Sequence, residues 1–95
     1  MHYTENGTPF TELLRQVHFT KHEQVWECTT IPGYVLRVEF RKNADGPQFF
    51  PTWQRTDGFG RRGATEGYHT MPGAVSWLVD QLISLGVRGR PAQTA

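Results

Sequence analysis

Three histidines are the residues whose spacing would suit a metal ion. His18 and His22 have the i, i+4 separation that places two imidazoles together on a helix, and His69 could supply a third ligand. A structural zinc site needs a full tetrahedral set of ligands, and the segment around His18 is not expected to be wholly helical. Exposed histidines in a connection between elements are the simpler interpretation. We therefore predict neither a metal nor another cofactor.

Cys28 is the one cysteine among the 95 residues, which excludes an intrachain disulfide and favours a reducing compartment. No local signature of a thiol enzyme surrounds it, and in a strand it would alternate in phase with Trp26 and Thr30. We expect a small buried side chain, because unreactive cysteines are among the most buried residues. An enzyme that uses His69 or Cys28 is the third of three functional hypotheses.

Basic residues are unevenly distributed along the chain, although the formal net charge is only +1. Residues 1–30 contain two basic and four acidic side chains, whereas residues 31–62 contain six basic and three acidic ones. Arginine beside aromatic residues offers stacking and bidentate contacts to a protein or a nucleic acid. The residues predicted to contact a partner are Arg37, Arg41, Trp53, Arg55, Phe59, Arg61 and Arg62.

Two segments have helical periodicity. Thr8 followed by Pro9 is a typical helix start, and the apolar residues that follow share one face: Phe10, Leu13, Leu14 and Val17. Thr70 and Pro72 repeat this signal ahead of a longer helix over roughly 71–85, with Gly86 as its left-handed C-terminal residue. The core face of this second helix is expected to include Val75, Leu78, Val79 and Leu82.

Strand periodicity lies between the two helices. The clearest signal is the alternation of Tyr34, Leu36, Val38 and Phe40 with polar or smaller residues, which predicts one core face. A preceding strand over about 24–30 reaches it through a turn at Pro32 and Gly33. The turn at 43–47 leads to a third strand over about 48–56, where Pro51 predicts an edge position or a bulge.

Residues 57–67 contain four glycines, which favours a mobile loop; a short strand over about 64–68 is the alternative. The predicted fold class is therefore α+β: one two-layer domain over residues 1–95, with an antiparallel meander of three to four strands between a short N-terminal helix and a C-terminal helix packed on the sheet. Residues 1–7 and 88–95 are expected to be flexible. No apolar run suits a membrane span or a secretion signal, which favours the cytoplasm.

The favoured functional hypothesis is a small non-enzymatic protein-binding module. A chain of this size without a catalytic motif would suit an accessory protein of a phage or mobile element that binds and blocks a host protein. The alternative is a double-stranded nucleic-acid-binding domain that uses the basic sheet face and the Gly/Arg loop, because a sheet backed by a helix resembles in topology domains that place strands in the major groove. Glu39 and Asp57 lie among the arginines and favour a mixed-charge protein surface over a polyanion.

Overall fold

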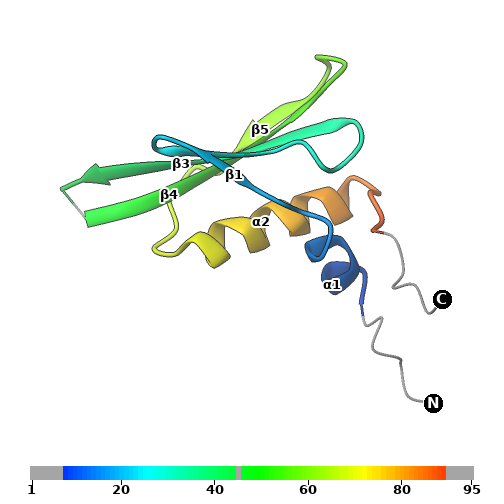
Figure 1. Ribbon diagram of the computed structural model, residues 1–95, viewed down its shortest axis with the longest axis horizontal. Coiled ribbons are helices and arrows are strands. Elements are labelled where there is room, and N and C mark those ends of the chain that lie inside the picture. Colours follow the sequence, from blue (N-terminus) through cyan, green and yellow to red (C-terminus); the bar gives the residue numbers. More distant parts are fainter. Residues whose placement is uncertain (1–7, 45, 90–95) are drawn as a thin grey trace.

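The computed structural model describes residues 8–44 and 46–89, which form one antiparallel sheet and two helices. In chain order the elements are α1 (Pro9–Leu14), β1 (Thr20–His22), β2 (Val25–Cys28), β3 (Tyr34–Asn43), β4 (Gly46–Arg55), β5 (Arg61–Gly63) and α2 (Met71–Ser84). The strands follow one another across the sheet in sequence order, and both helices lie on the same side of it (Figure 1). The predicted α+β meander is confirmed, with five strands rather than three or four.

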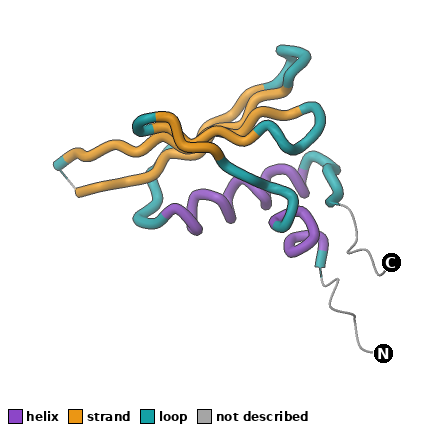
Figure 2. Tube along the Cα trace, viewed as in Figure 1, coloured by secondary structure: helices purple, strands orange, loops and turns teal. Residues whose placement is uncertain are grey.

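The centre of the sheet is the long hairpin of β3 and β4. Asn43 pairs with Gly46 at its turn, and this register places Leu36 opposite Trp53 and Phe40 opposite Phe49. Directly opposed residues of two antiparallel strands share a face, so these four side chains all lie on the side of the helices. Figure 2 shows the turn end of the hairpin extending past the start of α2.

The turn before β3 has the predicted geometry. Tyr34 N–H donates to the Ile31 carbonyl at 3.1 Å, and Gly33 has a φ of +87°. Proline at the second position fixes φ, and the left-handed third position favours glycine. This turn therefore confirms that β2 and β3 are adjacent antiparallel strands.

The predicted starts of both helices and the predicted C-terminal end of the second helix are also confirmed. The Thr8 hydroxyl accepts from Thr11 N–H at 3.2 Å, and the Thr70 hydroxyl accepts from Gly73 N–H at 3.1 Å. After α2, Gly86 has a φ of +88° and Val87 N–H donates to the Leu82 carbonyl at 2.9 Å, as in a Schellman motif. The first helix ends at Leu14 and is shorter than the predicted face through Val17.

The core lies between the sheet and the helices. Its buried hydrophobic side chains are Leu13, Cys28, Ile31, Leu36, Val38, Trp53, Ala74, Leu78, Val79 and Leu82. These residues confirm that the alternating strand packs beneath the second helix, as predicted, at the central positions of the strand. Tyr34 and Phe40 lie nearer the ends of that row, and Val75 lies near the start of α2; all three are only partly buried. Within the two described ranges, no helix is long and apolar enough to cross a bilayer.

The region predicted as a glycine-rich loop contains an edge strand. β5 covers Arg61–Gly63 rather than the expected 64–68, and Tyr68 makes only an isolated bridge with Phe49. Of the two alternatives predicted at Pro51, the edge position is wrong, because β4 pairs with both β3 and β5. The ladder between β4 and β5 is interrupted beside Pro51, between the Thr52–Gly63 pair and the Phe49–Tyr68 bridge. In an antiparallel ladder the nitrogen and the carbonyl of one residue point to the same neighbouring strand. Ala64 N–H donates to the Pro51 carbonyl at 3.0 Å, and the chain then leaves the ladder. Pro51 is therefore tolerated, because its nitrogen faces a place where no ladder hydrogen bond is needed.

The two ends of the chain were predicted to be flexible. Residues 1–7 and 90–95 lie outside the described residues. Arg88 and Gly89 are described, and a side chain on Gly89 would place its Cβ 2.6 Å from the backbone carbonyl carbon of Glu12. The chain after α2 therefore returns to lie directly against α1.

Candidate functional site

The sheet has one face that neither helix covers. We call it the open face. Strand alternation and the cross-strand register place on it the side chains of His22, Val25, Glu27, Val35, Arg37, Glu39, Arg41, Gln48, Phe50, Thr52, Gln54 and Arg61. Figure 1 shows this side of the sheet turned away from α1 and α2. Most of the open face lines a single shallow hollow of about 600 Å³.

Three apolar side chains of the open face lie among the polar ones in this hollow, which Trp53 also lines. Val25, Val35 and Phe50 belong to three different strands and are each partly buried. Apolar area on a surface that no part of the described chain covers becomes favourable to bury when another molecule docks there. The hollow therefore combines apolar contact area with polar groups that can set orientation.

Two ion pairs lie on the open face. Arg37 Nε donates to Glu27 Oε2 at 2.9 Å across the β2–β3 ladder, and Arg41 Nη2 donates to Glu39 Oε1 at 2.8 Å along β3. The Arg41 guanidinium also lies over the Phe50 ring, 4.7 Å from its centroid. Exposed pairs of this kind contribute little to stability. Their main consequence is that the two arginines are already neutralised locally by carboxylates.

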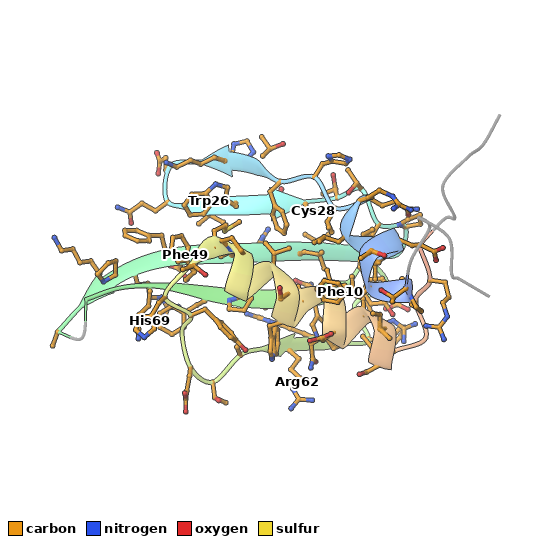
Figure 3. All side chains as sticks on the ribbon, turned by 90° about the horizontal axis from the view of Figure 1, so that it is seen from below. Phe10, Trp26, Cys28, Phe49, Arg62 and His69 are labelled. Carbon is orange, nitrogen blue, oxygen red and sulfur yellow. The ribbon has the colours of Figure 1, made fainter. Side chains whose placement is uncertain are left out.

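The predicted arginine cluster is divided between the two sides of the sheet. Arg61 pairs with Gln54 in the β4–β5 register and lies on the open face with Arg37 and Arg41. Arg62 is opposite Trp53 and lies on the helix side, at the β5 side of the molecule in Figure 3. Arg55 is also in the helix-side row of β4. Among the described residues, neither Arg61 nor Arg62 forms an ion pair.

Trp53 is largely buried in the core, yet it is also among the residues that line the hollow, so its predicted role as a partner contact stays a prediction. Its side chain is 7% exposed, and its indole N–H donates to Gln81 Oε1 of α2 at 3.2 Å. It also makes an edge contact with Tyr34, with 6.0 Å between ring centroids. The side of the sheet on which Trp53 lies could have been inferred from the turn between Asn43 and Gly46, because a hairpin closed at that turn puts Trp53 opposite Leu36.

Phe59 is the most exposed large hydrophobic side chain described, at 86%. It lies in the β4–β5 turn, which Asp57 organises. Phe59 N–H donates to Asp57 Oδ1 at 2.8 Å, and Arg55 Nη2 donates to Asp57 Oδ2 at 2.6 Å. The pKa of Asp57 lies below its usual value, first because the Phe59 N–H stabilises the carboxylate and also because Arg55 lies beside it.

This hydrogen bond predicts a pH titration of the turn. Because the folded pKa of Asp57 is lowered, the carboxylate stabilises the turn above the ordinary pKa and loses that effect as the pH falls below about 4. The Phe59 amide proton resonance should therefore move in that acid range and stay constant between about pH 5 and 8. In Asp57→Asn the movement should disappear. A Phe59 titration with its midpoint above pH 5 would contradict this assignment.

Cys28 and the histidines do not converge. Cys28 is fully buried with its Sγ 3.1 Å from the Thr30 hydroxyl oxygen, and that hydroxyl donates to the Gln16 carbonyl at 2.6 Å. The hydroxyl hydrogen is thus engaged, so the thiol is the donor to Thr30. Figure 3 shows Cys28 and His69 well apart, and His69 is exposed. Over residues 8–44 and 46–89, no group of three His, Cys, Asp or Glu side chains could hold a metal ion.

Sequence reasoning missed the residues that give the open face its character. Glu27 pairs with Arg37 only through the β2–β3 register, and Val25, Val35 and Phe50 meet only after three strands assemble. Together these features define a small α+β domain whose sheet is covered on one face and open on the other. No protein-family model, no curated protein and no solved structure matches the chain.

Proposed function

We propose that the chain is a non-enzymatic protein-binding module and that its open face is the contact surface. The observation that carries this proposal is the hollow of about 600 Å³, in which the apolar side chains Val25, Val35 and Phe50 lie among arginines and glutamates. Protein interfaces combine apolar contact area with a polar surround, and arginine and aromatic residues are enriched in them. The exposed ring of Phe59 at the β4–β5 turn is a second candidate contact.

Charge placement supports a protein partner over duplex DNA. A DNA backbone presents a dense row of phosphates and rewards a surface of uncompensated positive charge. On the open face Glu27 binds Arg37 and Glu39 binds Arg41, so both carboxylates would approach the phosphates together with the arginines. A protein surface of mixed charge can match both signs at once.

Affinity capture from a nuclease-treated lysate tests the proposal when it compares matched variants. Val35→Glu adds a charge to the hollow, whereas Arg88→Glu changes an exposed residue after α2. We expect the main partner to be retained by the unchanged protein and by Arg88→Glu, and to be reduced about tenfold or more by Val35→Glu, the factor that corresponds to 1.4 kcal/mol of binding free energy. Thermal melts of both variants control for unfolding.

Equal capture by all three proteins would place the contact elsewhere and overturn the assignment of the open face. The double-stranded nucleic-acid hypothesis stays the alternative, because the adjacent Arg61 and Arg62 have no acidic partner among the described residues. That hypothesis would replace ours if random duplex DNA of about 30 base pairs bound more tightly than micromolar in 50 mM salt, with steep loss at 200 mM and loss in Arg61→Ala/Arg62→Ala.

The biological setting is part of the same proposal. We infer a cytoplasmic protein, since Cys28 is a free buried thiol and a reducing compartment preserves it. We further propose an accessory role, in a phage or mobile element, in which occupying a surface of a host protein blocks that protein. The open face supports this role because a small domain with one broad contact surface can block a site without performing chemistry.

A further inference from the structure

We propose that the Arg61 side of the hollow binds a carboxylate from an acidic segment of the partner protein, with an apolar side chain of the same segment seated on Val35. This inference rests on the proposed function and specifies the chemistry of the partner. It starts from three open-face side chains that line the hollow and have no hydrogen-bond partner among the described residues: Thr52, Gln54 and Arg61.

The register brings these three groups together on two neighbouring strands. Arg61 of β5 lies opposite Gln54 of β4, and Thr52 is the next residue along β4 on the same face. Opposite Thr52 is Gly63, where a Cβ would lie only 3.1 Å from the Thr52 hydroxyl oxygen. The absence of a side chain at Gly63 leaves that hydroxyl accessible. A guanidinium, a hydroxyl and an amide therefore supply hydrogen-bond donors on one small area.

Charge balance indicates which chemical group these donors would bind. The two glutamates in the hollow already bind Arg37 and Arg41, so the positive charge of Arg61 is the one without a described counterpart there. A planar carboxylate matches a guanidinium in geometry and charge. A run of phosphates would also approach Glu27 and Glu39, which the hollow holds on the same surface.

The apolar part of the proposed occupant follows from the same cross-strand row. Val35 is opposite Gln54, which is opposite Arg61, so an apolar position lies two strands away from the guanidinium. Neighbouring strands are about 4.8 Å apart, which places the two positions about 10 Å apart. Residues i and i+3 of a segment in the polyproline II conformation span about 9 Å and point to the same side, because that conformation has three residues per turn and rises about 3.1 Å per residue. The hollow therefore suits an acidic residue and an apolar residue spaced along one extended chain.

Titration of the ¹⁵N-labelled protein with peptides tests this inference. The probe is a peptide of about ten residues in which glutamate and leucine alternate, and the matched peptides carry glutamine or lysine in place of glutamate. We expect the glutamate peptide to shift the amide resonances of Thr52, Gln54 and Arg61. Replacing glutamate by glutamine should weaken binding about tenfold, and so should Arg61→Gln. Arg62→Gln, on the other face of the same strand, should leave affinity unchanged.

The outcomes separate this inference from the broader proposal. Equal binding of the glutamate and glutamine peptides, or an unchanged affinity in Arg61→Gln, would overturn the carboxylate site while leaving the open face a protein-binding surface. Absence of binding by every peptide at millimolar concentration would also overturn it, and the capture experiment with Val35→Glu would still decide the proposed function. Tighter binding of duplex DNA at the same resonances would overturn both.

Discussion

Leu78→Ala is expected to lower the free energy of unfolding by about 2–5 kcal/mol, the range for removing a large side chain from a packed core. Leu78 is fully buried in the middle of α2, on the face that packs against the sheet. The substitution removes apolar contacts and leaves a cavity that a short sheet and one helix can fill only in part. In a domain of this size the melting temperature should fall by about 10 °C or more.

The matched control is Leu85→Ala. Leu85 is the C-cap residue of α2 and is 45% exposed, so the same chemical change removes much less buried area. Urea unfolding of both variants gives the comparison directly. Similar losses in the two proteins would mean that α2 does not use its Leu78 face to cover the sheet.

Trp53→Ala should cost about 3–5 kcal/mol, whereas Phe59→Ala should change stability by about 0.5 kcal/mol or less. The indole of Trp53 is 7% exposed and hydrogen-bonded to Gln81, while the ring of Phe59 is 86% exposed. The first substitution opens a cavity between β4 and α2 and leaves the Gln81 amide without this donor. The second removes a ring that almost no other side chain covers.

Calorimetry and partner binding together test the contrast between these two aromatic residues. Phe59→Ala should melt normally and weaken partner binding if the β4–β5 turn takes part in the contact. Trp53→Phe keeps a ring in the core and serves as the control for the Trp53 effect. A stable Trp53→Ala protein that loses partner binding would support the sequence-based interpretation of Trp53 as a contact residue.

Local signals in the sequence were sufficient for much of the fold. Thr8 before Pro9, Thr70 before Pro72, and Gly86 after α2 act through hydrogen bonds to their immediate neighbours, so each predicted helix end could be inferred from a few residues. The alternation from Tyr34 to Phe40 predicted a strand because one side of it is buried.

Other elements have no such signal because their stability comes from a neighbour. All three residues of β1 are exposed, and so are all three of β5, so neither strand has an apolar alternation to detect. β5 exists because β4 offers backbone groups along its side, with Arg55 N–H donating to the Gly60 carbonyl at 2.7 Å. The phase of β4 was also ambiguous, since Phe49 and Phe50 are adjacent aromatic residues that end on opposite faces.

The candidate site contains features of both kinds, some that local sequence signals predict and some that depend on strand pairing. Arg37, Arg41 and Arg61 all lie on the open face, but the carboxylates that neutralise the first two come into place through pairing with β2 and through a side-chain conformation on β3. Arg55 and Arg62 lie on the other side because strand alternation separates neighbours in the chain. The composition could therefore indicate a basic region, whereas the division of its arginines between the two faces of the sheet depended on strand register.

The two outermost strands have a consequence for how copies of this protein behave at high concentration. An unpaired strand edge is a template for intermolecular strand addition, and proteins limit that hazard with short edges and charged side chains. β1 and β5 are three residues each, with the Lys21 ammonium 5.1 Å from the Trp26 ring centroid at one edge and two arginines in β5 at the other. Such short edges offer few hydrogen bonds to an added strand, and their charges repel the same edge of an identical copy. Both effects oppose aggregation by edge-to-edge growth of the sheet.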